Sequence, residues 1–151
     1  MAAKHASTAQ TFLCDTSVLI AAADLRHTHH AASIAVVRTA AKAHAFCSAH
    51  TVAEVYATLT SAAYRGRLRS ADVGDVLDRI RRTFTVIGLT PTDYFAVTQD
   101  GLARGAQSGQ IYDALHLAAA VKADVKRVYT WNVKHFQALA PASIVDRIHT
   151  P

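Results

Sequence analysis

The sequence predicts an α/β fold, a three-layer α/β/α domain with a central parallel sheet of four or five strands. Short apolar segments alternate with longer helical patterns, as expected when helices connect parallel strands. The length of 151 residues fits one hydrophobic core. Apolar residues form 51% of the chain, which argues against disorder. We therefore expect one domain at 11–151 after a flexible tail at 1–10.

The first part of the domain reads as one strand followed by two helices. Residues 11–14 form a short apolar strand, and Asp15 with the two hydroxyl residues after it offers N-terminal caps for a helix at 17–24. A second helix is expected at 30–43, where apolar side chains and alanines recur on one face.

The middle of the chain adds two strands and two helices. Residues 45–49 form the second expected strand, and the helix after it is expected to run over 51–65 and to stop at Gly66. Ser70 opens a further helix, and the apolar segment 84–89 is the third strand. Two helices thus connect the second strand to the third.

The last part of the chain repeats this pattern. Pro91 suits the first turn of a long helix. A second helix is expected at 111–122, and a fourth strand at 126–131. Residues 133–139 are expected to form a helical turn before a last short strand at 143–146.

The chain is basic and shows no sign of a membrane segment. The net charge of +5 and the pI near 9.5 favour an anionic partner such as nucleic acid, although many proteins are mildly basic for no specific reason. No segment approaches the roughly eighteen apolar residues of a membrane span. Cys14 and Cys47 lie in apolar segments and are expected to be buried and reduced, which favours a cytoplasmic protein without membrane partners.

Four polar residues at the ends of apolar segments are the strongest functional signal. Asp15 follows the first strand, Asn132 follows the fourth, and Glu54 lies early in the helix after the second. Asp113 begins a helix that runs antiparallel to the fourth strand, so it returns to the same edge of the sheet. Because ligands of open parallel sheets bind beyond the carboxyl ends of the strands, we expect these four side chains to converge there.

Each of the three acids also has a purely structural interpretation. Asp15 can serve only as a helix cap, and Thr51 with Glu54 matches the capping box, in which a glutamate bonds back to its own helix start. Asp113 lies in a first helical turn, where a carboxylate interacts favourably with the helix dipole. Taken singly, these structural roles are the more common ones.

Asp113 is the hardest of the four residues to explain structurally. The segment 111–121 is apolar almost throughout, apart from Asp113 and His116. A helix that is apolar nearly all round is buried, and a buried carboxylate is costly unless it is paired or bound to metal. His116 lies three residues on, on the same face. The pair can be a satisfied core contact, two metal ligands, or a base with its orienting partner; for His116 we favour the first.

Three carboxylates in one pocket require compensation of their charge. They repel one another, and some take up protons unless a cation is present. Oxygen ligands suit Mg²⁺ or Mn²⁺, and such an ion activates water and stabilises charge on a phosphoryl group. The sequence therefore predicts divalent-metal chemistry on a phosphodiester.

Four segments of the chain resemble the PIN-domain ribonucleases, and among them the VapC-type toxins of toxin–antitoxin pairs. These segments are FLCDTSVLIAA, TVAEVYATL, QIYDALHLAAA and YTWNVKHF, and in this order they cover the chain from about Phe12 to Val145. The resemblance implies a parallel sheet flanked by helices, and an acidic pocket that hydrolyses RNA with Mg²⁺ or Mn²⁺. It also implies a homodimer and a small antitoxin protein that reaches into the pocket.

The resemblance also assigns roles to single residues. Asp15, Glu54 and Asp113 fall on the family's catalytic acids; Asp15 and Asp113 would hold the metal, with Glu54 binding it directly or through water. The family's fourth position, often aspartate, is Asn132 here, which leaves open whether one or two metal ions bind. Further residues are expected to line the site: Ser17, Thr130, Asn132 and His116. Basic residues are candidates for binding the RNA backbone: Arg65, Arg67, Arg69 and Lys134.

Three other functions remain as alternatives. A non-catalytic PIN-like module that binds RNA or protein would have a degraded metal site, which Asn132 would mark. A phospho-acceptor domain would need an acidic pair and a lysine near Asp15, and the third strand ends without an acid. A hydrolase built on Asp113 and His116 lacks an evident nucleophile, because no Gly-x-Ser-x-Gly elbow occurs.

Overall fold

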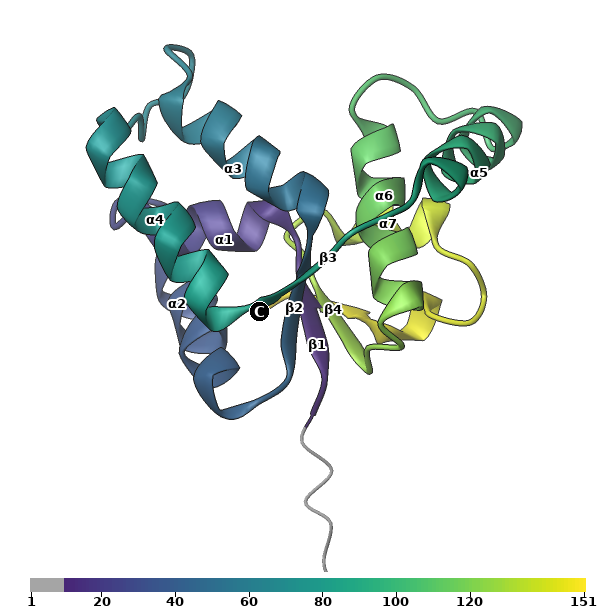
Figure 1. Ribbon diagram of the computed structural model, residues 1–151, viewed down its shortest axis with the longest axis horizontal. Helices are drawn as coiled ribbons and strands as arrows, with labels where there is room; N and C mark the ends of the chain where they lie inside the picture. The colour runs from purple at the N-terminus through teal and green to yellow at the C-terminus, as the bar shows by residue number, and fades with distance from the viewer. Residues whose placement is uncertain (1–9) are drawn as a thin grey trace, which may run out of the picture.

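The computed structural model describes residues 10–151, and the tail predicted at 1–10 falls outside this range except for its last residue. The described chain forms a five-stranded parallel sheet with the strand order β3-β2-β1-β4-β5 (Figure 1). The strands are β1 (Phe12–Cys14), β2 (Ala45–Ser48), β3 (Thr85–Ile87), β4 (Arg127–Tyr129) and β5 (Ile148–His149). The predicted α/β fold with a parallel sheet is confirmed.

Helices cover both faces of the sheet. Figure 1 shows α1 to α4 on one face and α5 to α7 on the other, which gives the predicted three layers. Within residues 10–151 there are seven α-helices and two short 3₁₀ helices. They are α1 (Thr16–Ala23), α2 (His30–Thr39), η1 (Ala40–Lys42), α3 (Ala49–Thr60), α4 (Ser70–Thr83), α5 (Pro91–Ala103), α6 (Gln110–Lys122), α7 (Val133–Leu139) and η2 (Val145–Arg147).

The central strand β1 is buried along its whole length. It lies between β2 and β4, and Leu13 is in register with Phe46 on one side and with Val128 on the other. All three residues of β1 are buried, as expected for a parallel strand with helices on both faces. Phe12 and Cys14 face the core beneath α1 to α4, and Leu13 faces the core beneath α5 to α7. The two hydrophobic cores therefore meet at β1.

The helix predicted at 51–65 begins at Ala49 and already ends at Thr60. Ser48, the last residue of β2, caps its start by accepting a hydrogen bond from the backbone N–H of Thr51. The loop after α3 is tied to α1, because the hydroxyl of Tyr64 donates to the Asp24 carboxylate over 3.0 Å. Gly66 lies so close to Asp24 that a Cβ atom there would collide with the carboxylate. The glycine thus permits a close loop contact and does not end the helix.

The last strand was predicted at 143–146, and that position is wrong. This segment is a turn in which the N–H groups of Ile144 and Val145 both donate to the carbonyl of Pro141. The strand β5 begins two residues after this segment and pairs with β4 through Val128 and Ile148. Ile144 is apolar because it fills the core beneath α7, and this burial does not require a strand.

The strand order places the site-bearing residues at one edge. After β1 the chain moves outward through β2 to β3, and it then returns to the other side of β1 through β4. The reversal lies between β1 and β4, where parallel α/β sheets form ligand sites beyond the strand ends. Asp15 follows β1, and Thr130 follows β4. Their side chains therefore face the same crevice.

Two further expectations concern the thiols and the membrane. Cys14 and Cys47 are buried and free, as predicted. Burial raises the pKa of both thiols, so neither is an ionised nucleophile. In the described part of the chain, no helix combines the length and the apolar character needed to cross a bilayer.

Truncation of the central strand should destabilise the fold strongly. Leu13→Ala removes a fully buried side chain next to Leu117 and Phe136, and we expect it to lower the free energy of unfolding by about 2–5 kcal/mol. Leu25→Ala is the matched control, because Leu25 is 82% exposed, and its effect should stay within about 0.5 kcal/mol. Urea denaturation measures both; equal losses would contradict the assignment of β1 to the centre of the core.

Candidate active site

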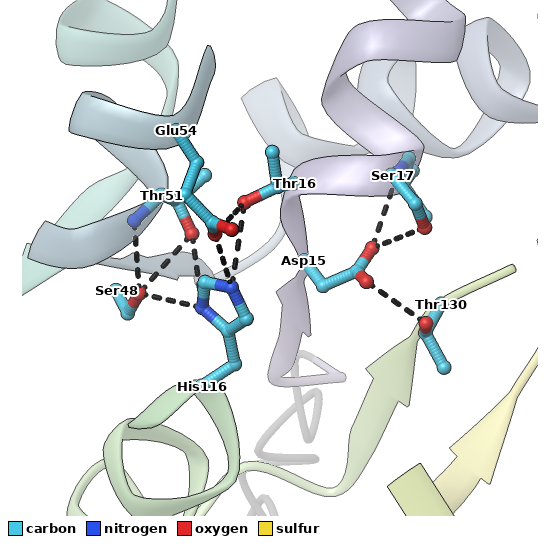
Figure 2. Close-up of polar contacts among 9 residues, drawn as sticks. Asp15, Thr16, Ser17, Ser48, Thr51, Glu54, His116 and Thr130 are labelled. Carbon is cyan, nitrogen blue, oxygen red and sulfur yellow. Dashed lines mark hydrogen bonds and ion pairs between the residues drawn. The ribbon is translucent and has the colours of Figure 1, made fainter. Parts of the chain in front are cut away.

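Asp15 lies at the carboxyl end of β1 and caps α1. Its side chain is only 2% exposed and accepts three hydrogen bonds. The Ser17 hydroxyl donates to Oδ1 over 2.7 Å, the backbone N–H of Val18 donates to Oδ1 over 3.1 Å, and the Thr130 hydroxyl donates to Oδ2 over 2.9 Å (Figure 2). The capping interpretation of Asp15 is correct, and its second oxygen faces β4 at the same time.

The two hydroxyl groups that bind Asp15 also fix the loop after β4. The Ser17 hydroxyl accepts from the backbone N–H of Trp131 over 3.0 Å. The Thr130 hydroxyl accepts from the backbone N–H of Asn132 over 2.9 Å. The start of α1 and the start of α7 are therefore joined through the Asp15 carboxylate. The Asn132 side chain is exposed and does not cap α7.

Asp113 lies in the first turn of α6, with a side chain that is 16% exposed. The pKa of Asp113 is raised to about 6, mainly by burial and also by the nearby charges of Asp15 and Glu54, while His116 and His135 act in the opposite direction. Nδ1 of His135 lies 3.9 Å from Oδ2 of Asp113. Because the charges of Asp15 and Glu54 act on it, Asp113 belongs to the same acidic region as these two residues.

A second polar network surrounds His116, which is 2% exposed. Its Nε2 atom lies 2.7 Å from Oε2 of Glu54 and its Nδ1 atom 2.7 Å from the hydroxyl of Ser48 (Figure 2). Thr16 donates to the same Glu54 oxygen over 2.6 Å. The Thr51 hydroxyl lies 3.3 Å from Nδ1. Residues from β2, α1, α3 and α6 thus meet at one buried imidazole.

The two networks impose opposite pKa shifts on their carboxylates. Burial raises the pKa of Asp15, in spite of nearby His116 and the hydrogen bonds from Ser17, Thr130 and Val18. Burial acts in the same direction on Glu54, but hydrogen bonds from His116 and Thr16 outweigh it and hold the pKa of Glu54 below its ordinary value. Glu54 is therefore a compensated carboxylate, whereas the charge around Asp15 and Asp113 is under-compensated.

The structure pairs His116 with Glu54 and not with Asp113. The imidazole is a buried, hydrogen-bonded core histidine, but its partner lies 62 residues away on α3. The capping box proposed for Thr51 and Glu54 is absent, because Ser48 is the cap of α3 and Glu54 turns towards α6. The sequence could not show these pairings, since they depend on how α3 and α6 pack.

The residues fit a divalent cation by their chemistry, although they do not enclose one. In residues 10–151, no three His, Cys, Asp or Glu side chains lie close enough together to hold a metal ion. Mg²⁺ needs fewer protein ligands, since it is usually bound by one or two carboxylates together with water and phosphate. The raised pKa values of Asp15 and Asp113 indicate a place where a positive charge would be favourable.

The basic candidates for RNA binding occupy two places. Arg65, Arg67 and Arg69 lie in the loop between α3 and α4, at the end of α3 far from the sheet (Figure 1). Arg69 is engaged by Asp72 through two bonds of 2.8 and 2.9 Å. Lys134 follows Asn132 by two residues, and both line an open depression of about 390 Å³. Lys134 is therefore the basic candidate with the most direct access to the strand ends.

Trp131 is tied into the protein by both ends of its ring. Its Nε1–H donates to the Ser33 hydroxyl over 2.9 Å, and its ring packs against the core beneath α1 to α4. His29 stacks on it with ring centroids 3.8 Å apart and planes 12° apart. Trp131 is therefore a structural side chain with one ring face covered by His29.

The geometry defines an α/β domain with an acidic site at the carboxyl edge of its sheet. The family model of the PIN domain matches residues 12–140. The chain belongs to the PIN-domain family. A search of curated proteins found no significant match.

Three solved structures resemble the fold. VapC20 of Mycobacterium tuberculosis, a toxin that cleaves the sarcin-ricin loop, is 17% identical with a TM-score of 0.64, over 82% of this chain and 92% of that one. VapBC2 of Rickettsia felis, solved with a DNA fragment from its promoter, is 14% identical with a TM-score of 0.63, over 94% of this chain and 99% of that one. PAE2754 of Pyrobaculum aerophilum is 21% identical with a TM-score of 0.60, over 87% of this chain and 81% of that one. At these identities the likeness shows the fold, and two of these neighbours are a VapC toxin and a VapBC complex.

The sequence interpretation missed the hydroxyl groups that organise the site. Thr16 was considered only as a helix cap and Ser48 not at all, although Thr16 follows Asp15 and Ser48 ends β2. Their position at the carboxyl ends of strands was a usable signal. His135 was also not predicted as a site residue, since its proximity to Asp113 depends on the packing of α7 against α6.

Neutralising Asp113 should change how stability depends on pH. In the unfolded chain an aspartate has a pKa of about 3.9, so the folded protein holds more protons between pH 4 and pH 6, and stability falls as the pH rises through this window. Asp113→Asn removes this loss. In metal-free buffer, we expect the variant to gain about 1–2 kcal/mol relative to wild type between pH 4 and pH 7. Urea denaturation at pH 4 and at pH 7 measures the free energy of unfolding of both proteins. If the difference between them is the same at the two pH values, the raised pKa of Asp113 is contradicted.

Proposed function

We propose that this protein is an endoribonuclease that depends on Mg²⁺ or Mn²⁺ and acts as the toxin of a toxin–antitoxin pair. The observation that carries the proposal is the pair of under-compensated carboxylates, Asp15 and Asp113, at the carboxyl edge of a PIN-domain sheet. The names of its structural neighbours support the toxin class, since one of them is a toxin that cleaves the sarcin-ricin loop.

Asp15 and Asp113 are the residues that would hold the metal ion. When bound, such an ion lowers the pKa of its water and stabilises charge on the phosphate. Ser17, Val18 and Thr130 keep the Asp15 carboxylate in one orientation through three hydrogen bonds. A fixed carboxylate needs no rearrangement when substrate arrives, which is the condition for electrostatic preorganisation.

Glu54 is proposed to accept the proton of the attacking water. Its pKa is held below the ordinary value, so the carboxylate is ionised at neutral pH and can receive a proton. Its side chain is 24% exposed and so remains in contact with solvent. The RNA backbone is proposed to lie along Lys134 and the loop that carries Arg65 and Arg67. The positive charges of these side chains would position the phosphates without reading the RNA sequence.

The proposed protein partners are a second copy of the chain and a small antitoxin. On α5, Phe95 and Leu102 are 70% and 79% exposed and lie seven residues apart, so they share one helix face that a second copy would cover. An antitoxin is supported by the neighbour that carries the name VapBC2. The charge of +5 suits an acidic segment of such a partner as well as RNA.

The second candidate function is a non-catalytic PIN-like module that binds RNA or protein. Two observations favour it: the amide Asn132 at the position where the family often has an aspartate, and the lack of a three-ligand metal cage in residues 10–151. Calorimetry with Mn²⁺ separates the two functions. A module with a degraded site would bind RNA without binding the metal.

Cleavage of RNA should require both the metal ion and Asp15. We expect purified protein to cut RNA with Mg²⁺ or Mn²⁺ and to stop when EDTA is added. Asp15→Asn should reduce the rate by roughly a hundredfold or more, because metal-based stabilisation of several kcal/mol is lost. The measurement is gel analysis of RNA fragments, followed by sequencing of fresh RNA ends after induced expression in cells.

The matched control is Asp75→Asn, an exposed aspartate on α4, which should cut RNA as fast as wild type. A toxin is expected to arrest growth and to cut RNA at discrete positions when wild type is expressed. Asp15→Asn is expected to do neither. Undiminished cleavage by Asp15→Asn would refute the proposed metal site.

RNA binding should weaken with salt, and Lys134 should contribute to this dependence. In the inactive Asp15→Asn background, Lys134→Ala is expected to reduce the slope of log affinity against log salt by about 0.7, the value for one phosphate contact on single-stranded RNA. Arg82→Ala is the control, because α4 ends where β3 begins and Arg82 lies at the opposite edge of the sheet. Fluorescence anisotropy at several salt concentrations gives the slopes; equal slopes for all three proteins would remove Lys134 from the RNA path.

A further inference from the structure

We propose that His116 is the positioning residue of Glu54, holding it through Nε2–H, and that Ser48 determines which imidazole nitrogen carries the proton. This inference rests on the proposed nuclease function and deepens it. It starts from the 2.7 Å contacts at both nitrogens of an imidazole that is 2% exposed (Figure 2). Such a buried ring cannot turn to solvent, so its partners define its orientation.

The proton on Nε2 follows from the chemistry of the partner. Glu54 is ionised at neutral pH and, as a carboxylate, can only accept hydrogen bonds. The contact between Nε2 and Oε2 is 2.7 Å long, a length typical of a charge-assisted bond. Nε2 must therefore carry a hydrogen and donate it to Glu54.

Ser48 is suited to stabilise this proton arrangement. Its hydroxyl oxygen accepts the backbone N–H of Thr51 over 3.1 Å, as the cap of α3. Its own hydrogen has two possible acceptors, Nδ1 of His116 at 2.7 Å and the Thr51 hydroxyl at 3.1 Å, and the shorter contact favours Nδ1. A ring that accepts at Nδ1 carries its proton at Nε2. The start of α3 thus fixes the imidazole, and the imidazole fixes a glutamate one and a half turns further along the same helix.

This network determines which Glu54 oxygen can act. Oε2 accepts from both His116 and Thr16, whereas in residues 10–151 no hydrogen bond ends on Oε1. With Oε2 engaged, Oε1 is the Glu54 oxygen left for a further partner, and no three-ligand cage includes Glu54 in the described chain. Glu54 therefore acts through Oε1 on a water molecule, and it is not a direct ligand of the metal ion.

The competing interpretation is that His116 only fills the core. Its ring lies parallel to Phe136 at a centroid distance of 6.3 Å, and any planar side chain could occupy that space. A filling role makes no demand on the position of the proton. It also predicts equal activity for His116→Gln and His116→Asn, although their amide groups reach different positions.

The first test uses the metal-free protein and needs no activity. Long-range ¹H–¹⁵N correlation spectra distinguish a protonated ring nitrogen from a bare one. For wild type we expect a proton on Nε2 of His116, and for Ser48→Ala a shift of the Nδ1 resonance because its partner is lost. A bare Nε2 in wild type, or an unchanged Nδ1 resonance in Ser48→Ala, would overturn the proposal.

The second test compares two amides of different reach. The amide of glutamine extends about as far as Nε2, so His116→Gln can still donate to Glu54, whereas the shorter amide of His116→Asn reaches only the Nδ1 position. We expect His116→Gln to keep kcat within about threefold, and His116→Asn to lose about 10- to 100-fold in kcat with KM for RNA unchanged. Equal kcat values in the two variants, provided circular dichroism shows both folded, would contradict the positioning role.

A metal-binding measurement completes the design. By calorimetry, His116→Asn should bind Mn²⁺ within about threefold of wild type, because Glu54 is not a ligand, whereas Asp113→Asn should lose affinity by tenfold or more. A large loss in His116→Asn would show that Glu54 ligates the metal and would refute the inference. If both His116 variants fail to fold, the spectra of wild type and Ser48→Ala decide the proposal. If wild type does not cut RNA, the nuclease proposal fails, whereas the proton assignment is still decided by the spectra.

Discussion

The burial of negative charge at the end of the central strand is the constraint on which the site depends. Asp15 is almost fully buried, and its three hydrogen bonds do not offset the cost of burial, since its pKa remains raised. Asp113 lies in the same region and shows the same direction of shift, partly because of the Asp15 charge. A protein keeps such a pair when something outside the chain compensates it, and a hard divalent cation has the matching charge and ligand preference.

The fold supplies the positions and the hydroxyl groups supply the orientation. The reversal of strand order between β1 and β4 creates the crevice. Within it, Ser17 and Thr130 donate hydrogen bonds to the Asp15 carboxylate and fix its orientation. A separate network of hydroxyl groups holds His116 and through it Glu54. Thr16 adjoins Asp15 in the chain and binds Glu54 through its side chain, so the two networks meet within one turn of α1. The site thus contains one compensated and two under-compensated carboxylates, which suits a division of roles.

The sequence predicted the features that follow from local pattern and from sheet topology. Alternating apolar and helical segments gave the parallel sheet, and strand ends identified Asp15, because any residue directly after a parallel strand lies at its carboxyl edge. It did not predict the partner of His116, since spacing along α6 only compares residues of the same helix, whereas Glu54 approaches from α3. It also misplaced the last strand, because Ile144 is apolar for burial in a turn and apolar character alone does not distinguish a strand from a turn.

The location of Mn²⁺ in crystals of the protein is the most direct test of the metal site. An anomalous difference map should show the ion between the carboxylates of Asp15 and Asp113, with Glu54 still hydrogen-bonded to His116. An ion bound elsewhere, or crystals soaked at saturating Mn²⁺ that show no ion at these two carboxylates, would contradict the claim that their uncompensated charge is there to hold a cation.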